Sequence, residues 1–361
     1  MRACQPSRDG YVERDGVKLH YQVYGSGEPT VFLLPTWSIM HSRHWKMQIP
    51  YLARHCRVLT FDGRGNGRSD RPPAPEAYRT AEFTADALAV MDATGTERAV
   101  LIAMSLGATW ALELGALHSE RVAGIVFIAP ALPLGQSAAR LAHSFTERLD
   151  TTEGWAKYNQ HYWREHYGEF LEFFFSQMFT EPHSTKPFED TVGWGLETDP
   201  ETLVATRLGS GAPGEPLSDP ERVAELATRV RCPVLVVHGD GDAIRPLVNG
   251  AKLAELADGE LVTIEGSGHA PHVRDPVKVN LLLRDFVKPA PPPRRWVRGK
   301  SRRKRALYIS SPIGLGHAQR DVAIAGELRK LRPDLEIDWL AQDPVTRVLE
   351  ARGERIHPAS A

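Results

Sequence analysis

Ser105 lies in the segment 103–107, AMSLG, whose residue types suit a serine nucleophile on a tight turn. An apolar run at 99–102 precedes it and a helical pattern at 106–118 follows it, which is the strand–turn–helix context that such a nucleophile requires. The residues two positions before and after the serine are alanine and glycine, small enough for strand and helix to approach. The amide of Leu106, at the start of the helix, would face developing negative charge. The alternative is a structural serine at a helix N-cap.

A serine nucleophile needs a histidine to take its proton and a carboxylate to fix the tautomer of that histidine. His269 follows a late apolar run and a Gly-Ser-Gly turn, so a loop could lay its imidazole over Ser105. Asp240 and Asp242 follow another late apolar run, 234–237. The chain order serine, acid, histidine matches this kind of nucleophile, and either aspartate could supply the carboxylate.

The elements that must position these residues alternate between short apolar runs and helix-length segments. Runs that are apolar throughout, separated by helices, predict a mostly parallel sheet with helices on both faces. A β-hairpin at 11–24, with a turn at Asp15-Gly16, precedes them. The predicted strands are 30–34, 58–61, 99–103, 125–129, 234–237 and 261–264, and the predicted helices are 81–93, 106–118, 248–256 and 277–287. We assign residues 1–130 and 221–288 to this α/β core.

Residues 131–220 interrupt the alternation. No strand-like run occurs there, and twelve aromatic residues crowd the stretch from 155 to 194, several at helical spacing. This pattern predicts an inserted helical lid, and its aromatic residues could form helix core, line an apolar pocket, or do both. The residues that we predict to line a substrate pocket are Trp37, Met104, Trp163, Phe174 and Ile244.

Across about residues 11–288 the sequence resembles the α/β-hydrolase superfamily. The motifs that carry the resemblance occur in the family's order, and they are LLPTW (33–37), DGRGNGRSD (62–70), the AMSLG segment, HGDGD (238–242) and GSGH (266–269). The resemblance implies an α/β-hydrolase fold with Ser105, Asp242 and His269 as a catalytic triad. It aligns the second aspartate with the triad acid, and Asp240 is expected to hold the loop.

The resemblance also implies an oxyanion hole made by the backbone amides of Leu106 and Trp37. The family usually has His-Gly in the loop after the strand at 30–34, whereas this chain has Pro35-Thr36. Trp37 is not proline and therefore keeps its amide donor.

These residues predict a serine hydrolase that attacks an ester-like or other activated carbonyl through an acyl-enzyme on Ser105. The crowded aromatic residues favour a small to medium apolar small-molecule substrate, and a carboxylesterase-like activity fits best. Hydrolysis of a carbon–carbon bond, perhydrolysis, and a ligand-sensing module without turnover are the alternatives. Serine in place of aspartate at position 105 argues against epoxide or haloalkane chemistry. We expect no cofactor and no metal, because no metal-ligand spacing or nucleotide fingerprint occurs.

The composition of the chain limits the binding partners and the cellular compartment that we expect. The 361 residues carry a net charge of −1, so no overall field selects nucleic acid or an anionic membrane. The three cysteines, at positions 4, 56 and 232, are sparse and form no CxxC, which fits a reducing compartment. The N-terminal residues have no apolar signal region, and no apolar stretch is long enough to span a bilayer. We therefore expect a cytoplasmic protein.

A boundary follows residue 288. Residues 289–305 are rich in proline and basic residues, which predicts an extended, solvated linker. A second α/β pattern occupies 306–361, and its PIGLGH segment (312–317) with Arg320 resembles the opening of a GT-B glycosyltransferase N-terminal domain. The resemblance implies a partial glycosyltransferase-like segment, whose nucleotide-sugar domain is missing from this chain.

Overall fold

The computed structural model describes residues 4–135, 139–288, 304–311 and 315–360. The chain separates into two compact units, Met1–Pro291 and Pro292–Ala361. The predicted linker lies almost wholly outside the described residues, as do Pro312, Ile313 and Gly314 of the glycosyltransferase-like segment.

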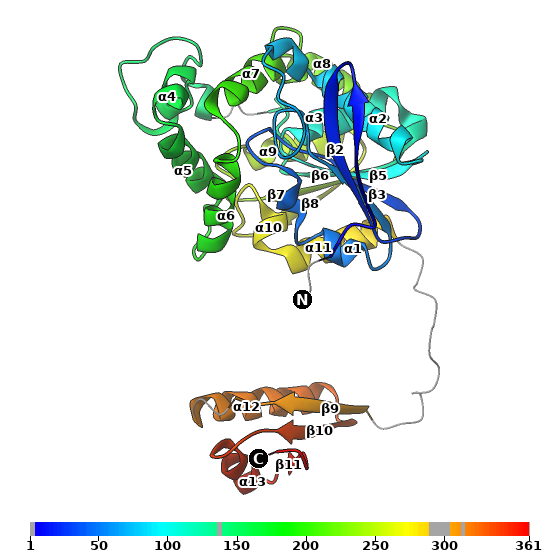
Figure 1. The fold of residues 1–361 in the computed structure, drawn as a ribbon, viewed down its shortest axis with the longest axis vertical. Helices are drawn as coiled ribbons and strands as arrows, with labels where there is room; N and C mark the ends of the chain where they lie inside the picture. The colour runs from blue at the N-terminus through cyan, green and yellow to red at the C-terminus, as the bar shows by residue number, and fades with distance from the viewer. Residues whose placement is uncertain (1–3, 136–138, 289–303, 312–314, 361) are drawn as a thin grey trace. The chain divides into compact units, whose positions relative to one another are not determined.

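An eight-stranded sheet forms the centre of the first unit (Figure 1). Its strands lie in the order β1-β2-β4-β3-β5-β6-β7-β8, and all neighbours pair in parallel except those of β2, which pairs antiparallel with both β1 and β4. The strands are β1 (Arg8–Arg14), β2 (Val17–Tyr24), β3 (Thr30–Leu33), β4 (Arg57–Phe61), β5 (Ala99–Met104), β6 (Val122–Ile128), β7 (Val234–Gly239) and β8 (Glu260–Ile264). The predicted α/β fold with a mostly parallel sheet is confirmed.

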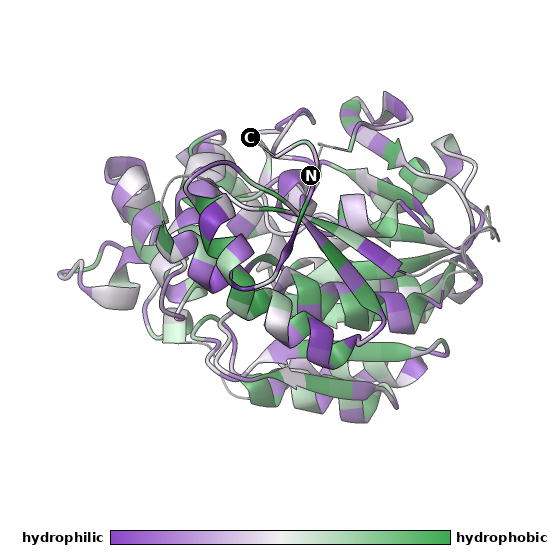
Figure 2. Cartoon of the chain, turned by 90° about the horizontal axis from the view of Figure 1, so that it is seen from below, coloured by the Kyte–Doolittle hydropathy of each residue, from purple (hydrophilic) through white to green (hydrophobic). Residues whose placement is uncertain are grey.

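The sheet is buried on both faces because helices cover both. Along β5, Val100, Ile102 and Met104 enter one hydrophobic cluster while Leu101 and Ala103 enter the other, as the period of two in a strand requires. Figure 2 shows the strands of this sheet as mostly hydrophobic. The helices of the core are α1 (Ile49–Leu52), α2 (Thr80–Ala93), α3 (Gly107–Leu117), α8 (Pro220–Arg229), α9 (Leu247–Leu256), α10 (Pro271–Arg274) and α11 (Pro276–Val287).

The stretch between β6 and α8 contains helices and turns and, in its described residues, no strand. Its helices are α4 (Gln160–Glu165), α5 (Tyr167–Met178), α6 (Thr185–Gly195) and α7 (Pro200–Ser210), which we call the inserted helices. Their aromatic side chains pack together and onto the core, with ring centroids 4.5 Å apart for Trp163 and Phe170 and 5.7 Å apart for Trp37 and Trp163. The inserted helices therefore share a hydrophobic core with the sheet.

The second unit is a small α/β segment with its own core. Three parallel strands lie in the order β11-β10-β9, and Trp339, Val345 and Leu349 are fully buried against them. Its elements are β9 (Lys304–Ile309), α12 (Leu315–Leu331), β10 (Leu335–Leu340), α13 (Val345–Ala351) and β11 (Arg355–Ile356). This confirms the predicted short C-terminal α/β segment. In the described parts of both units, no helix is long and apolar enough to cross a membrane.

Candidate active site

The turn that carries Ser105 has the backbone expected of a nucleophile elbow. Strand β5 ends at Met104, helix α3 begins at Gly107, and Ser105 between them adopts a φ of +54°, a left-handed value that non-glycine residues rarely take. A Cβ on Gly107 would lie 2.4 Å from the carbonyl oxygen of Pro35, so only glycine allows α3 to approach the loop after β3 this closely. The strained turn holds the serine side chain at the carboxyl end of the sheet.

A chain of hydrogen bonds joins the three predicted catalytic residues. The Ser105 hydroxyl lies 2.9 Å from Nε2 of His269, and Nδ1 of His269 lies 2.7 Å from Oδ2 of Asp242. Asp242 and His269 are buried, whereas Ser105 is half-buried and lines a cavity. These residues come from the ends of β5, β7 and β8, and the structure brings them together at one edge of the sheet.

Asp242 is held as an anion by more than His269. Its Oδ1 accepts the backbone N–H groups of Ile244 and Arg245 at 2.8 and 2.9 Å, and its Oδ2 also lies 2.9 Å from Nε2 of His238. Burial would raise the pKa of Asp242, but the nearby His269 and the hydrogen bonds from both histidines lower it below the ordinary range. His238 is a site residue that our sequence reasoning did not identify, although it opens the HGDGD motif.

The loop that carries His269 is tied down at several points. Asp240 accepts a hydrogen bond from the N–H of Gly266 at 2.7 Å and so holds the loop, whereas His269 bonds to Asp242. The backbone N–H of His269 donates to the carbonyl of Met178, at the end of α5, over 2.9 Å. The inserted helices thus help to position the histidine, a contact between distant segments that no local pattern reveals.

The two residues predicted to form the oxyanion hole lie at the cavity that Ser105 lines. Trp37 and Leu106 both line the same cavity as Ser105, and neither backbone N–H donates to another residue within the described ranges. Leu106 precedes the first residue of α3, where helical N–H groups have no partner within the helix. Both residues thus line the cavity with an unused amide donor, and their role in binding an oxyanion stays a prediction.

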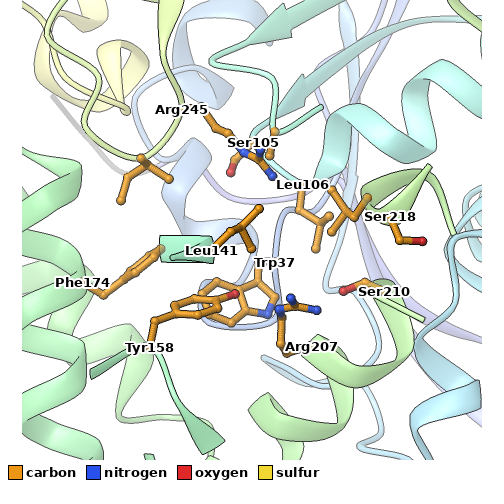
Figure 3. A pocket seen from close by; sticks show the side chains of 14 residues that line it. Trp37, Ser105, Leu106, Leu141, Tyr158, Phe174, Arg207, Ser210, Ser218 and Arg245 are labelled. Carbon is orange, nitrogen blue, oxygen red and sulfur yellow. The ribbon is translucent and has the colours of Figure 1, made fainter. Parts of the chain in front are cut away.

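The cavity at Ser105 is small and mostly apolar (Figure 3). It measures about 120 Å³, comparable to engineered cavities of about 150 Å³ that admit a benzene ring. Its lining residues are Trp37, Ser105, Leu106, Ala131, Leu141, Tyr158, Phe174, Arg207, Ser210, Gly211, Leu217, Ser218, Ile244 and Arg245. A larger cavity of about 530 Å³, lined by Met47, Tyr51 and Val277 among others, contains none of the three hydrogen-bonded residues.

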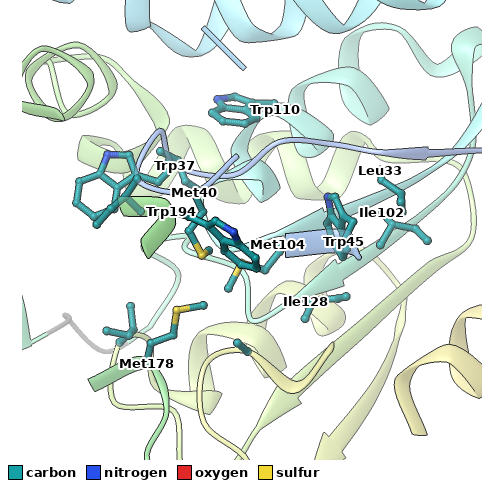
Figure 4. Close-up of a cluster of buried hydrophobic side chains, with 14 of the residues drawn as sticks. Leu33, Trp37, Met40, Trp45, Ile102, Met104, Trp110, Ile128, Met178 and Trp194 are labelled. Carbon is teal, nitrogen blue, oxygen red and sulfur yellow. The ribbon is translucent and has the colours of Figure 1, made fainter. Parts of the chain in front are cut away.

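Three of the five predicted pocket residues, Trp37, Phe174 and Ile244, line this cavity, and the prediction for Met104 and Trp163 is corrected. Both of these side chains are fully buried and are absent from the described cavity lining. Met104, at the end of β5, lies in a cluster of buried hydrophobic side chains (Figure 4), and the Trp163 ring packs against the Trp37 ring with their centroids 5.7 Å apart. Both side chains therefore pack in the hydrophobic core and do not form part of the cavity wall.

The polar part of the cavity wall was not foreseen. Arg207 and Ser210 come from one face of α7, and Arg245 follows the Asp242 loop. The indole Nε1–H of Trp37 donates to the hydroxyl of Thr206, also on α7, over 3.0 Å. The sequence pattern predicted α7 only as part of the inserted helical region. Which of its residues line the cavity depends on how that region packs.

Within the part of the chain that the structure describes, no cluster of three or more metal-ligating side chains occurs. All three cysteines are free, with Cys56 buried and Cys4 exposed. The groups gathered at this edge of the sheet include the Ser105 hydroxyl, the His269 imidazole and the Asp242 carboxylate, beside a cavity wall that is mostly apolar.

A model of the α/β-hydrolase fold family matches residues 29–276, and the chain belongs to this family. Among individual proteins, the chain is 38% identical over 128 residues to epoxide hydrolase A of Mycobacterium tuberculosis, an alignment that covers 35% of this chain and 39% of that protein. It is 26% identical over 280 residues to 2-hydroxymuconate semialdehyde hydrolase of a Pseudomonas species, over 75% of this chain and 91% of that one.

Among solved structures, the chain is similar to Est816, described as an N-acyl homoserine lactone degrading enzyme. The TM-score is 0.63 at 25% identity, covering 77% of this chain and all of the other. The structure and these relatives together support a hydrolase of the α/β fold. The glycosyltransferase-like resemblance of the second unit lies outside the family match and stays a prediction.

Proposed function

We propose that this protein is a serine hydrolase that cleaves esters or other activated carbonyl compounds through an acyl-enzyme on Ser105. The observation that carries the proposal is the uninterrupted hydrogen-bonded chain from Ser105 through His269 to Asp242. A serine hydroxyl placed against an imidazole that is itself oriented by a buried carboxylate is arranged for proton transfer and nucleophilic attack.

In the proposed reaction the Ser105 oxygen attacks the carbonyl carbon while its proton passes to Nε2 of His269. The carbonyl oxygen becomes an oxyanion, which the amides of Trp37 and Leu106 stabilise by about 3 kcal/mol each. The intermediate collapses, the bond to the leaving group breaks, and the leaving oxygen takes the proton from Nε2. Water then repeats the sequence on the acyl-enzyme, releasing the acid and restoring the serine. Throughout, Asp242 holds the imidazole orientation and stabilises its positive charge.

The size and walls of the cavity support a substrate with a short or single-ring group next to the carbonyl. A ring or a chain of a few carbons fits a space of about 120 Å³, whereas a long acyl chain does not. We extend neither epoxide hydrolysis nor the substrate of any named relative to this chain, because residue 105 is a serine and the identities are low. Hydrolysis of a carbon–carbon bond next to a carbonyl, and perhydrolysis, use the same three residues and remain the alternative reactions.

Activity against a series of 4-nitrophenyl esters, from acetate to decanoate, tests the proposal. We expect turnover of the short esters, loss of turnover in Ser105→Ala, and labelling of Ser105 by a fluorophosphonate probe. Binding of esters without turnover, unchanged in Ser105→Ala and without labelling, would instead indicate a ligand-sensing module.

The second unit enters the proposal only as an attached segment. Its predicted glycosyltransferase-like character depends on residues 312–317 and Arg320, of which 312–314 lie outside the described residues while His317 and Arg320 are exposed on α12. We propose that this segment needs a further nucleotide-sugar domain to act. Titration of the full chain with nucleotide sugars should show no binding. The cytoplasmic location expected from the cysteine content is likewise proposed.

A further inference from the structure

The charged lining of the Ser105 cavity is of one sign only. Among the described residues that line it, two are arginines, Arg207 and Arg245, and none is an aspartate or glutamate. The remaining wall is apolar apart from tyrosine and serine hydroxyls. An apolar pocket that contains cationic groups and no carboxylate favours a ligand with an apolar body and an anionic group.

Arg245 is already engaged in building the catalytic end of the cavity. Its side chain is 2% exposed, its backbone N–H donates to Oδ1 of Asp242, and its carbonyl lies 3.0 Å from Nε2 of His238. Arg245 therefore belongs to the scaffold that holds the triad acid, and the second cation of the cavity is the better candidate for binding a substrate.

Arg207, on α7, is half-buried and stacks on two aromatic rings. Its guanidinium carbon lies 5.3 Å from the ring centroid of Phe145 and 6.0 Å from that of Tyr158. In the described parts of the chain it forms no ion pair, whereas Arg164, on α4, is paired with Glu201 at 2.7 Å. A cation that is partly removed from water and has no carboxylate partner gains most from an anion delivered by a ligand.

Gly211 gives the Arg207 guanidinium its space. A Cβ on Gly211 would lie 1.8 Å from Nη1 of Arg207, although the φ of −106° at this glycine is open to any residue. The backbone therefore does not require glycine here, and the space that a side chain would fill is occupied by the guanidinium. Figure 3 shows Arg207 and Ser105 on opposite sides of the cavity, with Trp37 and Leu141 between them.

We propose that the substrate carries a carboxylate remote from its reacting carbonyl, and that Arg207 binds this carboxylate while the apolar wall encloses the part between them. This inference rests on the proposed function and specifies its substrate class. A guanidinium can hold a carboxylate with two parallel N–H···O bonds, which would fix the distance between the anion and the carbon that Ser105 attacks.

Matched pairs of esters test the proposal on the full chain. One pair is the 4-nitrophenyl monoester of glutaric acid and 4-nitrophenyl hexanoate, and the other is 4-butyryloxybenzoate and phenyl butyrate, so that the carboxylate lies on either side of the ester bond. We expect at least one anionic ester to have a kcat/KM about 10- to 100-fold above its neutral partner, the range expected for hydrogen bonds between charged groups. Monoesters of succinic and adipic acid then measure the preferred spacing.

Arg207→Met, which keeps the length and apolar character of the side chain, should abolish most of this ratio. Arg164→Met is the matched control, because this arginine also lies on an inserted helix but outside the cavity, and it should leave the ratio unchanged. Gly211→Ala should lower the ratio by displacing the guanidinium without removing its charge. Equal kcat/KM values for both members of each pair, or a preference that survives Arg207→Met, would overturn the proposal.

A binding measurement separates this inference from the proposed function. Glutaric monoanilide and hexananilide differ in the same way but have an amide in place of the ester, and calorimetric titration measures their binding without turnover. Tighter binding of the anionic anilide, lost in Arg207→Met, would support the carboxylate site even if no ester were hydrolysed. Hydrolysis of neutral esters with labelling of Ser105, but no preference for either anionic compound, would support the serine hydrolase and reject the carboxylate site at Arg207.

Discussion

The two halves of the candidate site are built in different ways. Ser105, Asp242 and His269 are placed by turns at the ends of β5, β7 and β8, so their positions follow from the sheet itself. The opposite wall, with Tyr158, Phe174 and Arg207, is placed by the packing of inserted helices against one another. The catalytic half is thus placed mainly by the sheet and its turns, with an added hydrogen bond from the His269 amide to Met178 of α5, whereas the wall depends on contacts between distant segments.

The largest expected effect lies in the catalytic half. Asp242→Asn removes the charge that orients and stabilises the imidazole, and we expect kcat to fall by about 10⁴-fold, as in other triads. Asp240→Asn is the matched control, since this neighbour bonds to Gly266, and kcat should change by less than about tenfold. Steady-state kinetics on one short ester compares them, and the reverse order of effects would assign the acid role to Asp240.

The next prediction distinguishes an aromatic residue of the core, Trp163, from one of the cavity wall, Phe174. Trp163→Ala and Phe174→Ala both remove buried aromatic rings, and each should lower the free energy of unfolding by about 3–5 kcal/mol. Because Phe174 lines the cavity and Trp163 does not, only Phe174→Ala should move the preferred acyl length toward longer chains. Denaturant unfolding and the ester series measure the two outcomes. An equal shift of the preferred acyl length in Trp163→Ala would show that Trp163 also forms part of the cavity wall.

A smaller loss is expected when the support of Asp242 is weakened. His238→Asn takes away a hydrogen bond to the buried carboxylate, and kcat should fall by about 10- to 100-fold with little change in KM. A positioning role also predicts that the downfield proton NMR signal of the His269 Nδ1–H group shifts. A variant with altered stability but an unmoved signal and an unchanged kcat would contradict this role.

The smallest effect concerns acid stability near the catalytic loop. Burial, and to a lesser degree the nearby His269, lowers the pKa of His272 to about 3, and its Nε2 lies 3.1 Å from Nδ1 of the buried His44. The unfolded chain binds a proton at this residue below pH about 6.5 while the folded chain does not. The contribution of His272 to stability is therefore complete above pH about 6.5 and is lost as the pH falls toward 3.

The slope associated with this loss should reach about 1.4 kcal/mol per pH unit for one histidine. Urea unfolding between pH 7 and 5 should show a shallower decline in His272→Gln than in the natural sequence. His20 acts in the opposite direction: burial lowers its pKa, but hydrogen bonds to Asp62 and Asp9 leave it raised. An unchanged slope in His272→Gln would show that this residue is not buried in its neutral form.

What could be predicted from the sequence follows the same division. The hairpin, the six later strands and the serine turn were predictable because each depends on the alternation, turn residues and small neighbours of its own segment. Arg207 could not be assigned to the cavity, because the sequence of its helix does not indicate which helix face lies toward Ser105. Met104 was misassigned because it is the last residue of β5, a strand that is buried on both faces, so its side chain packs in the core.

His238 shows an intermediate case. The HGDGD motif drew attention to its two aspartates, and no role was predicted for the histidine, which the structure places within the buried strand β7. Its contact with Asp242 depends on the loop folding back over the strand end by four residues, a turn that the glycines permit but do not specify. The residues that perform chemistry were thus easier to recognise than the residues that hold them in place.

The central claim is that Ser105 carries the acyl group during turnover, and acid quenching followed by mass spectrometry tests it most directly. The protein is mixed with a short 4-nitrophenyl ester, quenched within milliseconds to seconds, digested and mapped. We predict one acyl group per chain on the peptide that contains Ser105, formed together with a burst of nitrophenol and absent in Ser105→Ala. Turnover that leaves Ser105 unmodified at every time point, or an acyl group on another side chain, would contradict the account.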